Sequence, residues 1–147
     1  MKTSSFSKTF IVRLHETDLG GIVHHSNYFH WIEETEYALF DHIGEEVVGE
    51  FDESLEGSGW PRSEMHVKFV QPVKFRDEIR VDLSIKRIRS AAIVYQVDMF
   101  RLNKDGSEDK VLTGNYTATC CLYDGTFQKP PRVIPIPDSF LAKITAV

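Results

Sequence analysis

The stretch HETDLGGIVHHSNYFHWIEE, residues 15–34, changes character twice within a short span. A carboxylate, Asp18, stands just before Gly20 and Gly21, and a short apolar step then leads to two histidines and a segment with helical periodicity. A turn needs only the glycines, so the acidic residue and the helix start beside them call for a separate explanation.

A long helix is predicted over residues 27–43, directly after this turn. Apolar side chains recur there at helical spacing, at Tyr28, Trp31, Ile32, Thr35, Leu39 and Ile43. The acidic residues point in other directions around the helix, and they are Glu33, Glu34, Glu36 and Asp41. Ser26 or Asn27 is expected to cap the start, and Gly44 is expected to end the helix.

Segments of strand character make up most of the remaining chain. Residues 6–15 predict a first strand, whereas the acidic, glycine-rich residues 45–59 predict a loop. Further strands are expected at 65–73, 78–86, 92–102 and 111–124, with a hairpin turn at Asp105-Gly106, an extended segment at 129–137 and a short helix at 138–144 capped by Asp138. This order predicts an α+β fold, in which an antiparallel β-sheet wraps around one long central helix.

Composition narrows the class of protein. A chain of 147 residues fits a single domain over 1–147, and a net charge of −5 argues against a general nucleic-acid binder. The chain has no apolar run of membrane-spanning length and its N-terminus lacks a signal-peptide core, so we expect no membrane partner and a cytoplasmic location. Cys120 and Cys121 are adjacent and poorly placed to bond each other, which predicts one buried and one half-exposed free thiol.

Asp18 is the strongest candidate for chemistry. Taken alone, it is most simply a turn aspartate that accepts hydrogen bonds from nearby backbone amides. Its context adds a second interpretation, because Gly20 and Gly21 allow a ligand to approach the backbone and the helix start near His25 offers unpaired N–H groups. A carboxylate facing such N–H groups suits acyl chemistry, in which the carboxylate attacks a carbonyl or activates water and the amides hold the developing oxyanion.

Two other clusters have both a functional and a simpler explanation. His24, His25 and His30 suggest a metal site, but His25 and His30 are five residues apart and fall on different faces of a helix, so no metal is expected. Lys86, Arg87 and Arg89 form a basic run in an acidic protein, which is either a solvated turn or a site for phosphate oxygens.

The motif from Glu16 to Glu34 resembles the signature of the hotdog-fold acyl-CoA thioesterases of the 4-hydroxybenzoyl-CoA thioesterase type, especially their YbgC-like branch. The matching positions are Asp18, Gly21, Val23, Asn27-Tyr28, Trp31 and Glu33, and HVKFVQPVKFRDEIRV, residues 66–81, resembles a later strand and turn of the family. The resemblance departs at Glu34 and Glu36, where the YbgC-like branch usually has arginines, and at Arg76, where a glycine is usual.

This resemblance implies roles for particular residues. Asp18 is the catalytic carboxylate, His25 matches the histidine of the YbgC-like branch, and backbone N–H groups of Gly21, His25 and Ser26 polarise the thioester carbonyl. The remaining implied substrate contacts are Tyr28, Trp31 and Met65 for the acyl group and Lys86, Arg87, Arg89 and Ser90 for coenzyme A. The family also implies a homodimer or homotetramer with sites at subunit interfaces, and it needs no cofactor beyond the coenzyme A of its substrate.

The sequence therefore predicts an acyl-CoA thioesterase. Two alternatives stay open. One is a hydratase or dehydratase of the same fold that acts on acyl thioesters, although its usual motif is missing. The other is a non-catalytic acyl-CoA-binding protein, which would keep the basic run but tolerate the loss of Asp18.

Overall fold

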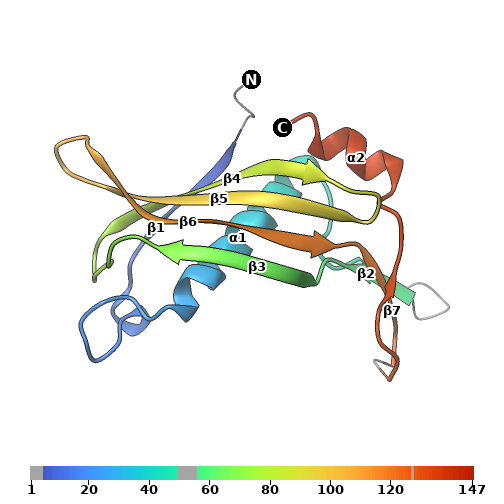
Figure 1. The fold of residues 1–147 in the computed structure, drawn as a ribbon, viewed down its shortest axis with the longest axis horizontal. Helices are drawn as coiled ribbons and strands as arrows, with labels where there is room; N and C mark the ends of the chain where they lie inside the picture. The colour runs from blue at the N-terminus through green and yellow to red at the C-terminus, as the bar shows by residue number, and fades with distance from the viewer. Residues whose placement is uncertain (1–4, 50–55, 127) are drawn as a thin grey trace.

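A computed structural model describes residues 5–49, 56–126 and 128–147 of the chain. Up to residue 43 the chain forms a strand, a 3-10 turn and the long helix, and the described residues after it are mostly strands followed by a short helix (Figure 1). In chain order the elements are β1 (Phe6–Ile11), η1 (Leu14–Glu16), α1 (Ser26–Ile43), β2 (Glu56–Gly59), β3 (Arg62–Phe69), β4 (Glu78–Ile88), β5 (Ala92–Leu102), β6 (Glu108–Thr119), β7 (Cys121–Asp124), β8 (Arg132–Val133) and α2 (Asp138–Ile144).

The main sheet is antiparallel and has the strand order β1-β4-β5-β6-β3. Alternation along β4 places Ile79, Val81 and Leu83 on the buried face, as the sequence predicts. Helix α1 crosses this buried face (Figure 1). Trp31, Ile32, Leu39 and Phe40 of the helix join the same core cluster as the strand residues. The predicted architecture, one sheet around one long helix, is confirmed.

A second, three-stranded sheet has the order β2-β7-β8 and was not predicted. The expected loop at 45–59 contains strand β2 at its end, while residues 50–55 lie outside the described residues. The expected single strand over 111–124 is two strands, because the chain leaves the main sheet at Cys120 and β7 then pairs with β2. Cys120 and Cys121 are both buried at this crossing, so the expectation of one half-exposed thiol is wrong.

Helix α1 starts and ends close to the predicted bounds, but its start is formed differently. Gly44 follows the last turn in the left-handed conformation with φ 72°, and its N–H donates to Phe40 O and Asp41 O. At the other end His25 occupies the cap position without a side-chain cap, so the predicted capping by Ser26 or Asn27 is wrong. The Asn27 amide is used instead to hold the preceding loop.

Two smaller predictions need adjustment. The first strand ends at Ile11 rather than at residue 15, since the chain leaves the sheet and turns into η1 at Leu14. Pro137, not Asp138, occupies the cap position of α2. Within the described residues, no helix is long and apolar enough to cross a membrane.

Candidate active site

The loop that carries Asp18 is anchored by Glu16, a residue that the sequence did not single out. Its side chain is buried, and its two carboxylate oxygens accept from Arg13 N at 2.7 Å and from Trp31 Nε1 at 2.9 Å. Its backbone oxygen accepts from His24 N at 2.9 Å and from Asn27 Nδ2 at 2.8 Å. Glu16 therefore ties η1 to the first turn of α1 and sets where the intervening loop lies.

Between these anchors the chain makes a tight turn around Asp18. The Asp18 N–H donates to Ile22 O at 2.9 Å, and the Gly21 N–H donates to Asp18 O at 3.1 Å. Gly21 has φ 79°, which a residue with a side chain adopts only with strain. The Asp18 side chain is exposed and its Oδ1 accepts from Gly20 N at 2.7 Å, so this carboxylate is both a turn aspartate and accessible to a ligand.

The turn and the helix start form one wall of a pocket of about 310 Å³. Asp18, His25 and Tyr28 all line it, which brings together three residues that the sequence picked out. The opposite wall is the end of β3 and the segment after it, and the remaining lining residues are Ile22, Val23, Phe69, Val70, Gln71 and Pro72. The pocket thus combines a carboxylate and a histidine with a mostly apolar wall.

Tyr28 is a buried residue that lines this pocket. Its ring lies edge-on to Phe69 at 5.2 Å and to Trp31 at 5.4 Å between centroids. Burial, with a further contribution from the negative charge of Asp77, raises the pKa of the Tyr28 hydroxyl. The hydroxyl therefore stays protonated at neutral pH and can donate a hydrogen bond.

Three backbone N–H groups are predicted to bind the oxyanion, and two of them donate hydrogen bonds within the loop instead. The Gly21 N–H is used within the turn, and the Ser26 N–H donates to His24 Nδ1 at 3.2 Å. The His25 N–H enters neither of these bonds and lies at the cap position directly before α1, where the helix dipole favours negative charge. Of the three predicted donors, His25 is the one best placed to serve an oxyanion.

The residues predicted to contact the acyl group are spread over three environments. Tyr28 lines the Asp18 pocket, whereas Trp31 is buried in the core with its indole N–H on Glu16. Met65 lines a separate pocket of about 320 Å³ on the β3 side of α1, together with Phe29, His30, Ile32, Glu33 and Arg62. Of these three predicted acyl contacts, only Tyr28 lines the Asp18 pocket within one chain.

The basic cluster, Lys86, Arg87 and Arg89, is exposed and lies at the far end of the sheet, next to the exposed Ser90. The Asp18 loop sits at the beginning of β4, since Val23 N donates to Val73 O and Ile22 bridges Lys74. The cluster sits at the end of β4, which at strand rise is about 30 Å away. One chain does not bring the basic cluster and Asp18 together.

A second buried carboxylate, Glu36, belongs to the core rather than to the Asp18 pocket. The sequence expects it to point away from the apolar side of α1, but it is 1 % exposed. Its Oε2 accepts from Arg62 at 2.5 Å and from Tyr116 Oη at 2.8 Å. Burial raises the pKa of Glu36, although Arg62 and Tyr116 act in the opposite direction. Periodicity alone misses this pairing, because both partners come from distant strands.

Comparisons with known proteins agree on one fold. A family model described as "Thioesterase-like superfamily" matches residues 12–144. A protein of Aquifex aeolicus (strain VF5) named "Putative esterase" is 25 % identical over 135 residues, which cover 84 % of this chain and 89 % of that protein.

Solved structures match over nearly the whole chain. The 4-hydroxybenzoyl-CoA thioesterase of Pseudomonas sp. strain CBS-3 has a TM-score of 0.78 at 18 % identity, covering 94 % of this chain and 97 % of that one. A 1,4-dihydroxy-2-naphthoyl-CoA thioesterase from Synechocystis has a TM-score of 0.77 at 14 % identity and covers 96 % of each chain. At these identities the likeness establishes the fold, and it confirms the predicted hotdog architecture.

Proposed function

We propose that this chain, which belongs to the thioesterase-like superfamily, hydrolyses acyl-CoA thioesters to a free carboxylic acid and coenzyme A. The observation that carries the proposal is the pocket shared by Asp18 and His25 at the start of α1. It supplies an accessible carboxylate and a helix-start amide on one wall, which are the two groups that acyl transfer from a thioester requires.

In the proposed reaction the thioester carbonyl lies between Asp18 and the His25 N–H. The carboxylate either attacks the carbonyl carbon, giving an anhydride that water then hydrolyses, or takes a proton from water as the water attacks. In both routes the C–S bond breaks, the acyl carbon gains an oxygen from water, and the thiolate of coenzyme A leaves and is protonated. The bond from Gly20 N to Asp18 Oδ1 supports either role, since it fixes the carboxylate orientation.

Binding of coenzyme A is proposed to involve two copies of the chain. Strand β3 is an edge of the main sheet, with Phe69 beside the Asp18 pocket and Arg62 at the far end. Across the sheet, Arg62 pairs with Ala118, Ala118 pairs with Ile93, and Ile93 pairs with Ile88. The Arg62 end of β3 therefore lies level with the end of β4. Antiparallel pairing of two β3 edges would therefore bring the partner's basic cluster toward Asp18, where it would bind the phosphates.

The names of structural neighbours support this choice of substrate class. Besides the two thioesterases above, an Asp-to-Asn variant of 4-hydroxybenzoyl-CoA thioesterase was crystallised with 4-hydroxybenzoyl-CoA, and that structure has a TM-score of 0.76 at 16 % identity over 95 % of this chain and 98 % of that one. The aromatic wall formed by Tyr28 and Phe69 is compatible with an aryl acyl group as well as with an aliphatic one.

Thiol release from a panel of benzoyl-, hexanoyl- and palmitoyl-CoA tests the proposal. We expect release by the native chain, and Asp18→Asn should lower kcat by about 10²–10⁴-fold. Asparagine retains an oxygen that can accept from Gly20 N, so the variant should keep its Tm. Asp41→Asn, an exposed carboxylate near the end of α1, is the matched control. Retained activity in Asp18→Asn refutes the mechanism. Absence of thiol release with every substrate favours a hydratase or a binding protein.

The role of the basic cluster is tested separately. Arg87→Ala and Arg89→Ala should raise KM for the CoA thioester with little change in kcat, and the effect should weaken in high salt. The same acyl group on N-acetylcysteamine has no phosphates and should show no change in KM. Lys104→Ala, in the exposed β5–β6 hairpin, controls for net charge. An equal loss with both substrates contradicts phosphate binding.

A further inference from the structure

The main sheet has two edge strands, β1 and β3. Among the described residues β1 pairs only with β4 and β3 pairs only with β6, so each has one side without a neighbouring strand. An open edge presents unpaired N–H and C=O groups, to which a strand of another molecule can add. The β3 edge already has a proposed partner, a second copy of this chain, whereas the β1 edge has none.

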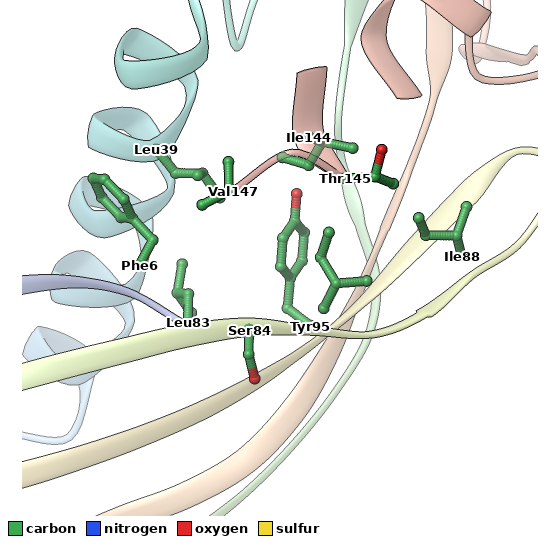
Figure 2. A pocket seen from close by; sticks show the side chains of 10 residues that line it. Phe6, Leu39, Leu83, Ser84, Ile88, Tyr95, Ile144, Thr145 and Val147 are labelled. Carbon is green, nitrogen blue, oxygen red and sulfur yellow. The ribbon is translucent and has the colours of Figure 1, made fainter. Parts of the chain in front are cut away.

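The β1 edge carries a lysine on the face that covers the core. Residues directly opposite in an antiparallel pair have their side chains on the same face, and Lys8 is opposite Val81, which is fully buried. The neighbours of Lys8 on this face are Phe6 and Phe10, and both pack against the core. Figure 2 shows Phe6 and Leu83, which is opposite to it, pointing to the side of the sheet on which α1 lies. The core face of β1 therefore places a charge between two aromatic rings.

The Lys8 ammonium reaches out of this apolar row toward α1. Its Nζ lies 3.3 Å from Glu34 Oε2 and 5.2 Å from the centroid of the Phe10 ring. The Lys8 and Glu34 side chains are 40 % and 57 % exposed, so this ion pair contributes little to stability. A β-branched apolar residue would suit the strand and extend the apolar row. Stability of the fold therefore does not explain why a lysine stands here.

Pairing of two β1 edges into one continuous sheet would bury this charge. Such a sheet keeps a common core face only if opposite residues come from the same face of each strand. The two registers that pair most of β1 then place Lys8 opposite its own copy or opposite Phe10. The first brings like charges together, and the second encloses the ammonium and Glu34 between strands and removes them from water. Both registers are unfavourable.

Pairing of β1 with the β3 edge of another copy would be unfavourable for the same reason. The core face of β3 is apolar at Met65 and Val67, so the Lys8 ammonium would be covered by a surface without a counter-charge. Such a contact would also leave a free edge on each added copy. Head-to-tail contacts of this kind continue into filaments unless they close into a ring.

We propose that Lys8 directs assembly: its charge on the core face keeps the β1 edge from pairing with any other copy of this chain. The sheet can then associate through its β3 edge alone, which gives a closed dimer instead of an open-ended filament. This role does not depend on the proposed hydrolysis, because neither Lys8 nor Glu34 lines the Asp18 pocket. The dimer itself rests on the pairing proposed for β3, whereas the block at β1 does not.

Sedimentation velocity over a range of protein concentrations tests this role. Lys8→Val completes the apolar row on the core face, so it should convert a discrete native species into assemblies whose mass rises with concentration, by about fivefold or more at the highest concentration. Circular dichroism establishes that the variant is folded. Lys8→Thr, a second neutral variant with good strand propensity, should also associate and keeps the test decisive if Lys8→Val does not fold.

Two variants control for the charge and for the position. Lys8→Arg keeps the positive charge and should sediment as the native chain does. Lys110→Val is the matched control, since Lys110 also pairs with a carboxylate, Asp98, at 3.1 Å and is 46 % exposed, but its strand β6 is not an edge. Native-like sedimentation of the folded neutral variants, or growing assemblies of the native chain, Lys8→Arg or Lys110→Val, would overturn the proposal.

Discussion

Two carboxylates, one near the start of helix α1 and one in its second half, have opposite surroundings. Near its start, Asp18 is exposed and accepts a single hydrogen bond from the turn that carries it. In its second half, Glu36 is buried and accepts from both Arg62 and Tyr116. The difference separates a group that a substrate can reach from one whose bonds are used for stability. A carboxylate count from the sequence treats the two as equivalent.

The largest effect on stability is expected at Glu36. Glu36→Ala leaves Arg62 and Tyr116 without their acceptor and should lower the free energy of unfolding by about 3 kcal/mol, because Arg62 keeps partial access to water. Both donors use Oε2, so Glu36→Gln can keep both bonds through its amide oxygen and should cost much less. Urea denaturation measures both variants, and an equal loss would contradict the pairing.

The next largest effect is expected at Glu16. Glu16→Ala removes the acceptor for Arg13 N and Trp31 Nε1, which should cost about 2 kcal/mol and also lower kcat, because the Asp18 loop loses its anchor. The loss of activity should exceed the loss caused by Glu36→Ala at a temperature where both variants are folded. If Glu36→Ala lowers kcat as much as Glu16→Ala does, the expected difference between the functional surroundings of the first half of α1 and the structural surroundings of its second half is contradicted.

A smaller effect is expected from the backbone of the Asp18 turn. Gly21→Ala places a side chain at φ 79° without any steric contact, and should cost about 1 kcal/mol. Gly106→Ala is its matched control, since Gly106 has φ 86° and equally open surroundings in a distant hairpin. Thermal unfolding should shift alike in both variants, while kcat should fall only in Gly21→Ala. A parallel loss of activity in Gly106→Ala would show that stability alone is responsible.

The smallest expected effect concerns the pH dependence of stability. Because burial raises the pKa of Glu36 above its usual 4.5, the folded state holds more protons than the unfolded state between 4.5 and the folded pKa. The contribution of Glu36 to stability is therefore full below pH 4.5 and is lost as the pH rises through the folded pKa. Glu36→Gln should remove this slope, whereas Glu46→Gln, at an exposed carboxylate that does not contribute to the pKa of Glu36, should retain it. An unchanged slope in Glu36→Gln would contradict this assignment.

The sequence predicted the fold class, the family and the enzyme class, and all three are confirmed. It located α1 to within a residue at its start and predicted Gly44 as its end, because helical periodicity and a left-handed glycine are local properties. The grouping of Asp18, His25 and Tyr28 was also within reach, since a short loop keeps them close in space. The roles assigned to these residues in the reaction remain predictions.

Other features depended on tertiary structure, because their partners are distant along the chain. The loop anchor at Glu16, the burial of Glu36 against Arg62 and Tyr116, and the strand β2 that pairs with β7 are set by packing and leave no local periodic signal. The basic cluster was identified from the sequence, but only the strand register shows that it lies at the other end of the sheet from Asp18.

By itself, the sequence determined the one long helix, the strands that surround it and the turn that exposes Asp18, since each follows from the order of neighbouring residues. Only the tertiary structure decided which carboxylates are buried, which donors are left without partners and which clusters meet within one chain. Such properties depend on contacts between residues tens of positions apart, and these contacts exist only once the sheet has closed over the helix.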